Sequence, residues 1–115
     1  MLFRSIVGNL VDNALDALAG GRGGRIELTA VAESGRVVLE VRDDGPGIPD
    51  ADLARIFEPG WSTKPERGAA SRGLGLALVS VTAARLGGSV RAANDHGAVL
   101  TVDVPVRAST PVTTP

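Results

Sequence analysis

The chain has 115 residues, of which 43% are hydrophobic, and this size and composition are typical of one globular domain with a single core. A formal net charge of -1 leaves no broad basic surface, which disfavours duplex nucleic acid or direct contact with an anionic membrane. The sequence contains no cysteine, so disulfides and thiolate metal sites are excluded. The lack of a leader-like or bilayer-length apolar run favours a cytoplasmic domain.

The first third of the chain predicts a helix followed by a hairpin. Residues 2–19 carry apolar side chains every three or four positions, and two glycines end the pattern at Gly20. Residues 25–33 and 36–43 alternate in polarity and are joined by Ser34 and Gly35, which predicts two antiparallel strands.

The remainder predicts a short helix, a long loop, a second long helix and then two strands. Proline at position 49 indicates a short helix over residues 49–56. Residues 57–72 lose periodicity and are expected to form a long mobile loop. Helical spacing returns from Leu74 to Leu86, and strands follow at 89–93 and 99–104. We expect one domain over residues 1–107 and a disordered tail over 108–115.

An acidic residue ends the second strand on its apolar face. Val37, Leu39 and Val41 alternate toward one face, and Asp43 falls on that same face. A buried carboxylate needs a polar partner, and an adenine amine would supply one. The glycines that follow, Gly45 and Gly47, allow a loop to lie against a flat ring. The alternative is an ordinary hairpin turn, since these residue types also favour turns.

Three polar residues share one stripe of the first helix. They are Asn9, Asn13 and Asp16, spaced four and three residues apart. An asparagine oxygen is a suitable neutral ligand for a magnesium ion whose charge is balanced by phosphates. Capping or hydrogen bonding along a polar helix edge is the alternative, and we favour it for Asn9 or Asp16 taken alone. For Asn13 we favour the ligand.

A second glycine motif precedes the second long helix. Gly73 and Gly75 are predicted at the start of that helix, where free amides and the helix dipole favour phosphate. The preceding polar loop excludes a Rossmann turn, and the spacing is not that of a P-loop. Lys64, after Thr63, is the best loop candidate for a phosphate contact, and a solvated surface charge is the alternative.

Taken in order, four segments resemble the N, G1, F and G2 boxes of bacterial sensor histidine kinases. They are Asn9-Leu10-Val11-Asp12-Asn13-Ala14, Asp43-Asp44-Gly45-Pro46-Gly47-Ile48, Ile56-Phe57-Glu58-Pro59 with Ser62-Thr63-Lys64, and Arg72-Gly73-Leu74-Gly75-Leu76. The sequence segments around Asn9 and Lys64 are most similar to those of the kinases that sense citrate or C4-dicarboxylates. The resemblance implies an α+β fold of the GHKL superfamily, a two-layer Bergerat-type sandwich with helices on one face of a mixed sheet.

The resemblance also implies a site for ATP and Mg²⁺. Asn13 would bind the metal, Asp43 the adenine amine, and Phe57 would anchor the lid from within. The other positions implied to line the nucleotide are Asn9, Asp16, Gly45, Gly47, Ile48, Thr63, Lys64, Gly73, Leu74, Gly75 and Leu76. Lys64 and Arg72 are the implied catalytic residues.

Three departures from the family pattern shape the expected function. The strand and acidic residue that usually lead into the first box are missing, so we expect an N-terminally truncated domain. The last glycine box is reduced to Gly97 and Ala98. The single histidine, His96, falls in a predicted hairpin turn and is expected to be a surface residue that accepts no phosphate.

The implied activity is transfer of the γ-phosphate of Mg-ATP to a histidine on a separate helical dimerisation domain, with a response regulator downstream. The expected location is the cytoplasm, whether or not the parent protein is membrane-anchored. Three alternatives remain open. An ATP hydrolase of the gyrase type needs a general base where this chain has Asn9, so hydrolysis should be slow. A serine kinase acting on an anti-anti-sigma factor and a degenerate nucleotide-binding module are the other two.

Overall fold

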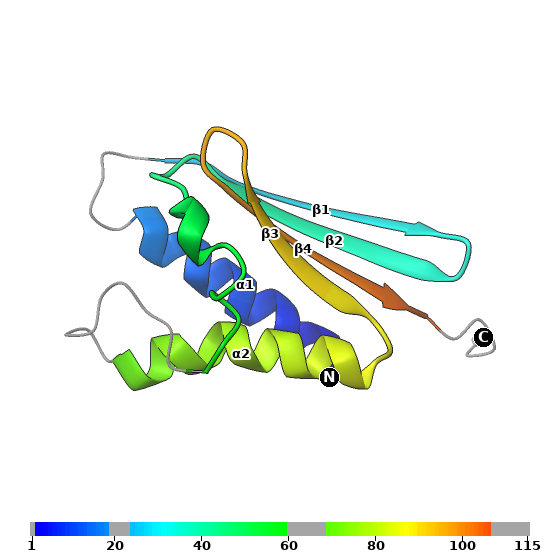
Figure 1. The fold of residues 1–115 in the computed structure, drawn as a ribbon. Helices are drawn as coiled ribbons and strands as arrows, with labels where there is room; N and C mark the ends of the chain where they lie inside the picture. The colour runs from blue at the N-terminus through cyan, green and yellow to red at the C-terminus, as the bar shows by residue number, and fades with distance from the viewer. Residues whose placement is uncertain (1, 19–23, 60–68, 107–115) are drawn as a thin grey trace.

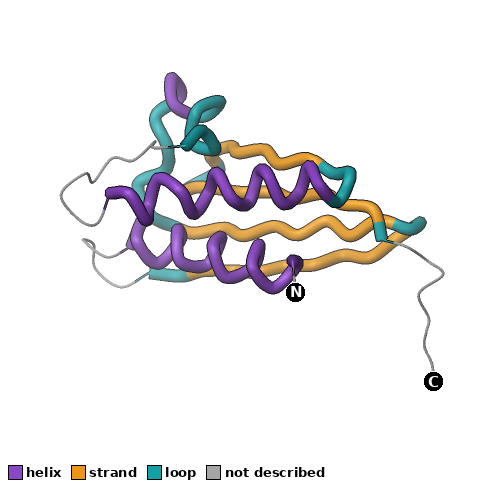
Figure 2. The backbone as a smooth tube through the Cα atoms, turned by 90° about the horizontal axis from the view of Figure 1, so that it is seen from below, coloured by secondary structure: helices purple, strands orange, loops and turns teal. Residues whose placement is uncertain are grey.

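The computed structural model describes residues 2–18, 24–59 and 69–106. Two helices cover one face of a four-stranded sheet, which confirms the predicted α+β sandwich of two layers (Figure 1). The helices are α1 (Leu2–Leu18) and α2 (Ala69–Arg85), and they lie side by side and antiparallel across the sheet (Figure 2).

The sheet has the strand order β1-β2-β4-β3 and is antiparallel at every pairing among the described strands, where the resemblance had implied a mixed sheet. Its strands are β1 (Ile26–Glu33), β2 (Arg36–Asp43), β3 (Ser89–Asn94) and β4 (Ala98–Pro105). After α2 the chain enters β3, which runs in the same direction as β2. β3 is not the neighbour of β2 in the sheet. Because β4 fills the space between them and runs against both, these strands form no parallel pair.

The predicted turn between β1 and β2 is a two-residue hairpin loop. Ser34 has φ 52° and Gly35 has φ 78°, and positive φ at both central residues is typical of a type I′ turn. The turn sets the register, which begins with Glu33 opposite Arg36 and ends with Ile26 opposite Asp43. The turn at the start of β2 therefore sets which residue of β1 lies opposite Asp43 at the end of β2.

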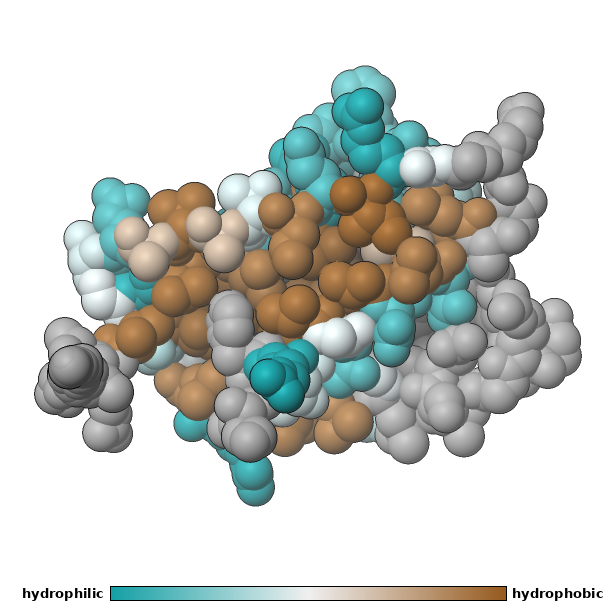
Figure 3. Space-filling view, turned by 180° about the vertical axis from the view of Figure 1, so that it is seen from behind, coloured by the Kyte–Doolittle hydropathy of each residue, from teal (hydrophilic) through white to brown (hydrophobic). Residues whose placement is uncertain are grey.

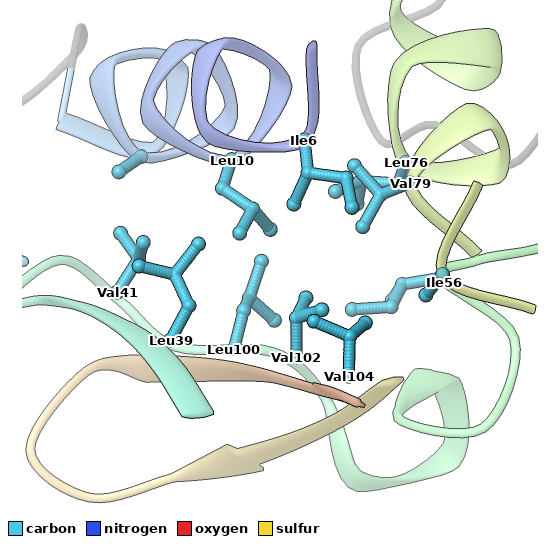
Figure 4. Packing of buried hydrophobic residues seen from close by; sticks show 12 residues of the cluster. Ile6, Leu10, Leu39, Val41, Ile56, Leu76, Val79, Leu100, Val102 and Val104 are labelled. Atoms are coloured by element: carbon cyan, nitrogen blue, oxygen red, sulfur yellow. The ribbon is translucent and has the colours of Figure 1, made fainter. Parts of the chain in front are cut away.

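The core lies between the helices and the sheet (Figure 4). Ile6 and Leu10 of α1 point toward Leu39 of β2 and Val102 of β4, and all four side chains are fully buried. Ile56, from the segment before the described chain breaks, enters the same cluster and is 1% exposed. This packing holds α1 at a fixed height above the sheet.

Two predicted helix boundaries are wrong. The helix expected over residues 49–56 is only a 3₁₀ turn, Asp50–Asp52, followed by consecutive turns, because Pro49 begins the segment and Pro59 soon blocks its continuation. α2 begins at Ala69, before the glycine motif. Its other end is as predicted: Gly88 N–H donates to the Ala83 carbonyl at 2.8 Å, and Gly87 has φ 86°, as in a Schellman motif.

β1 extends beyond the area that the two helices cover. Leu28 is 49% exposed although it pairs with the buried Val41 and faces the helical layer. The view from behind shows an apolar band along this side of the molecule (Figure 3). Neither helix is long and apolar enough to cross a bilayer, as judged over the described ranges.

Candidate functional site

One end of the sandwich gathers the segments that the sequence singled out. The loop after β2, the turn between β3 and β4, the end of α1 and the start of α2 all lie at the left end of the molecule in Figure 1. The β1–β2 turn and the end of α2 lie at the opposite end. The topology therefore brings together motifs that are far apart in the sequence.

Asp43 lies where the alternation predicted it, at the end of β2 on the core side, and is 7% exposed. Its Oδ1 accepts hydrogen bonds from the backbone N–H of Gly45 at 2.9 Å and of Ala98 at 3.3 Å. Both bonds end on the same oxygen, which leaves Oδ2 able to accept from a further donor. The carboxylate is thus fixed in orientation by the protein backbone.

Gly97 permits this arrangement, and the sequence had given it no role beyond a reduced glycine box. Its φ is 138°, and a Cβ at this position would collide with the Asp43 carbonyl oxygen and lie 2.9 Å from the Asp44 Cα. Only glycine lets the β3–β4 turn approach β2 this closely. The approach delivers the Ala98 N–H to Asp43 Oδ1.

The loop after Asp43 is held at both ends. Asp44 Oδ1 accepts from the Arg25 N–H at 2.8 Å, and the Asp44 N–H donates to the Arg25 carbonyl at 3.3 Å. At the other end, Asn94 exchanges two hydrogen bonds with Ile48. Asn94 was not predicted as a site residue. Its position at the end of a strand, beside a turn, was the available signal, because asparagine there readily bonds to backbone.

The polar stripe of α1 faces the glycine motif of α2. Asn9, Asn13 and Asp16 are all partly exposed. A Cβ on Gly75 would lie 3.6 Å from Asn9 Oδ1, an ordinary contact distance. The structure therefore brings the first and last predicted motifs together, at the positions of Asn9 and Gly75.

The glycine motif lies within α2, which differs from the prediction that it precedes the helix. Gly73 is the fifth residue of α2 and Gly75 the seventh. In an α-helix only the first four amides lack intrahelical acceptors. The Gly73 and Gly75 amides therefore belong to the helical ladder here and do not form an open anion site. The side chains of Arg72 and Leu74 lie outside the described part of the chain, whereas Leu76 is buried in the core.

The predicted lid falls mainly outside the described residues. Thr63 and Lys64 lie in that segment. Phe57, expected to anchor the lid, is partly buried and packs against the core. Its neighbour Ile56, the first residue of the same box, is the more deeply buried side chain at 1% exposed.

A charged cluster borders the site on the outer face of the sheet. Arg42 donates to Asp95 Oδ2 at 3.0 Å and to Glu40 Oε1 at 2.9 Å, and these bonds raise the pKa of Arg42. The same guanidinium, and then His96, lower the pKa of Asp95. The His96 side chain is 97% exposed, which agrees with its prediction as a surface residue.

No group of three or more histidine, acidic or cysteine side chains in the described ranges could hold a metal ion. A neutral amide oxygen can still serve as one ligand of a magnesium ion whose other ligands are phosphate and water oxygens. The Asn13 amide oxygen fits that role, since Mg²⁺ commonly takes one or two protein ligands together with substrate phosphates and water.

Known proteins match most of this chain in sequence and in fold. A family model described as histidine kinase-, DNA gyrase B-, and HSP90-like ATPase matches residues 1–108. The sensor histidine kinase DcuS of Escherichia coli K12 is 43% identical over 91 residues, which is 79% of this chain and 16% of DcuS. The sensor protein CitS of Bacillus subtilis 168 is 40% identical over 104 residues, 88% of this chain and 18% of CitS. The chain thus spans less than a fifth of the length of these relatives.

Solved structures give the same result. The catalytic domain of histidine kinase ThkA, in a nucleotide-free form, superposes with a TM-score of 0.77 at 29% identity, covering 90% of this chain and 66% of that one. Full-length ShkA in complex with AMPPNP gives a TM-score of 0.72 at 37% identity, covering 90% of this chain and 21% of ShkA. The predicted resemblance to sensor kinases, including the group of DcuS and CitS, is confirmed.

Proposed function

Because the chain belongs to the histidine kinase-, DNA gyrase B- and HSP90-like ATPase family, we propose that it binds ATP with Mg²⁺ and presents the γ-phosphate to a histidine on a separate helical domain. The site lies between α1, the loop after β2 and the start of α2. The observation that carries the proposal is Asp43, a buried carboxylate fixed by two backbone donors with one oxygen left to accept.

At the adenine end, Asp43 accepts a hydrogen bond from the exocyclic amine. Guanine carries a carbonyl oxygen at the equivalent position, so the same carboxylate would repel it. Gly45, Gly47 and Ile48 form the loop beside the ring, and the ShkA complex with AMPPNP supports an adenine nucleotide as the ligand of this fold.

At the phosphate end, Asn13 contributes one oxygen to the magnesium shell. When bound, the metal neutralises phosphate charge during transfer. Gly73, Leu74 and Gly75 supply backbone amides to the phosphates once the first turns of α2 open. Thr63 and Lys64, which precede α2 in the sequence, and Arg72, in its first turn, add polar and cationic contacts.

The acceptor histidine belongs to another domain. His96 lies in the turn between β3 and β4, where its side chain is exposed and its Nδ1 is 3.0 Å from Asp95 Oδ1. Phosphoryl transfer needs an in-line nucleophile, which a docked helical domain would provide. We propose that the ATP-binding domain lies in the cytoplasm. A response regulator would then receive the phosphoryl group from the acceptor histidine.

Hydrolysis of ATP is the less favoured function. Asn9 stands where a hydrolase of this family has its general base, and an amide cannot accept the proton of an attacking water. The serine-kinase and degenerate-sensor alternatives are also less favoured, because DcuS is named as a sensor histidine kinase and CitS as a sensor protein.

Titration calorimetry of ATP binding to the wild-type chain and to Asp43→Asn tests the adenine assignment. This variant keeps an oxygen for the Gly45 and Ala98 amides but replaces the free oxygen with an NH₂ donor, which opposes the adenine amine. We expect a loss of about 1–3 kcal/mol of binding free energy, the usual cost of losing a hydrogen bond to a charged group.

The matched control is Asp50→Ala, an exposed carboxylate on the 3₁₀ turn, which should bind ATP as the wild type does. Unchanged ATP affinity in Asp43→Asn, with the fold intact, would remove Asp43 from the adenine site.

A further inference from the structure

We infer that Asn94 is a positioning residue for the adenine end of the site, holding the backbone of Gly47 and Ile48 in the geometry that ATP binding requires. The inference rests on the proposed function, because it assigns a role toward ATP to a side chain that does not itself touch the reacting atoms.

The contact is a two-point clamp. Asn94 Oδ1 accepts from the Ile48 N–H at 2.8 Å, and Asn94 Nδ2 donates to the Ile48 carbonyl at 2.6 Å. Both polar atoms of the Asn94 amide bond to the backbone of Ile48. A residue of a neighbouring antiparallel strand makes the same pair of hydrogen bonds. The side chain of Asn94 therefore fixes the orientation of the loop backbone as well as its distance.

The residue before Ile48 is shaped to this clamp. Gly47 has φ 83°, and a Cβ there would lie 2.9 Å from Asn94 Oδ1. Glycine at position 47 thus has two roles: it leaves room for the Asn94 amide, and it adopts the left-handed backbone conformation without strain. The side chain of Ile48 packs against the core, so the clamp joins β3 to a loop that is anchored from below.

The same strand end also supports the adenine acceptor. Asn94 pairs with Ala98 in the ladder between β3 and β4, and the Ala98 N–H donates to Asp43 Oδ1. One β-hairpin end therefore supports both the carboxylate that would accept the adenine amine and the loop that would lie beside the ring. A shift of the loop relative to Asp43 would spoil the site even with every ligand-contacting residue present.

A role in overall stability explains this less well. Asn94 is exposed, and hydrogen bonds at an exposed position are readily replaced by water, so their loss affects global stability little. The loop itself consists of glycine and proline between Asp44 and Ile48 and has few side chains with which to hold its own shape. The clamp therefore acts on the local geometry.

The test compares Asn94→Ala with Ser89→Ala, an exposed residue at the opposite end of the same strand. If only a fraction of Asn94→Ala molecules hold the loop in the geometry that binds ATP, the ATP affinity is multiplied by that fraction. We expect about a tenfold loss of ATP affinity. GTP makes no favourable hydrogen bond with Asp43, so its affinity should fall little in Asn94→Ala. The ratio of ATP affinity to GTP affinity should therefore decrease. Ser89→Ala should match the wild type in both affinities.

Hydrogen exchange of the nucleotide-free chain provides a second measurement. In Asn94→Ala the Ile48 amide should lose protection while the amides of the central strands β2 and β4 keep theirs, and Tm should change no more than in Ser89→Ala.

An unchanged ATP affinity in Asn94→Ala, or equal losses for ATP and GTP, would overturn the positioning role. A wild-type chain that binds no ATP would overturn the proposed function, and the role of Asn94 toward ATP with it. The wild-type titration therefore separates the two failures.

Discussion

Asp43 shows how a charged side chain is kept on the apolar side of a sheet. Burial removes hydrating water from a carboxylate, and two backbone amides, from Gly45 and Ala98, replace part of that hydration. Backbone donors cannot rotate away as side chains can. The carboxylate is therefore oriented before any ligand arrives, and binding does not have to supply the cost of ordering it.

Asn13 is the residue through which magnesium should affect affinity. We predict that Asn13→Ala weakens ATP binding about tenfold with Mg²⁺ present and by far less when Mg²⁺ is chelated, since only the metal-dependent part of the affinity passes through this amide. Calorimetry with and without a chelator measures both values. Asp12→Ala, an exposed neighbour on α1, is the control. Equal losses in the two conditions would show that Asn13 supports the fold instead.

Among the elements, α2 departs most from what the sequence indicates. Ala69 and Ala70 favour helix strongly, but they carry no apolar spacing to reveal it, and the glycines that follow were interpreted as a helix start. The helix therefore includes Gly73 and Gly75 in its first turns. Glycine weakens a helix by roughly 0.5–1 kcal/mol relative to alanine, so these turns are predisposed to open.

We predict that Gly73→Ala keeps the first turns of α2 helical and lowers ATP affinity about threefold to fivefold, in proportion to the helix propensity gained. Thermal unfolding and ATP titration together measure the two effects. Gly8→Ala is a matched control, because Gly8 lies in α1 and a Cβ there meets nothing within 4 Å. That variant should gain stability without losing affinity. Full ATP affinity in Gly73→Ala would mean that α2 stays closed when nucleotide binds.

The β1–β2 hairpin and the core-facing position of Asp43 follow from local patterns, whereas the contacts that hold the site depend on strand order. Ser34 and Gly35 indicate the hairpin by turn chemistry alone, and alternation places Asp43 on the core face. The donation from Ala98 to Asp43 spans 55 residues and exists only because β4 lies beside β2. The hydrogen bonds from Asn94 to Ile48 span 46 residues, so the local sequence could indicate a backbone-bonding asparagine at a strand end but not its partner.

At the scale of the whole molecule, we propose that this chain supplies the nucleotide site and that the acceptor histidine lies on another domain. Asp43, the loop after β2, the polar stripe of α1 and the start of α2 meet at one end of the sandwich (Figure 1). Within the described residues, His96 is the only histidine and is fully in solvent beside Asp95. Such an arrangement suits a module that holds a phosphoryl donor and meets its acceptor by docking.

Incubation with ATP labelled at the γ-phosphate tests this account most directly, first with the chain alone and then with the histidine-bearing helical domain of its own parent protein. We predict no label on this chain, only trace phosphate release, and rapid labelling of the helical domain that Asp43→Asn slows at sub-saturating ATP, because the donor site and the nucleophile lie on separate domains. Label on this chain, or brisk phosphate release without the helical domain, would contradict the kinase module and favour a self-modifying enzyme or a hydrolase.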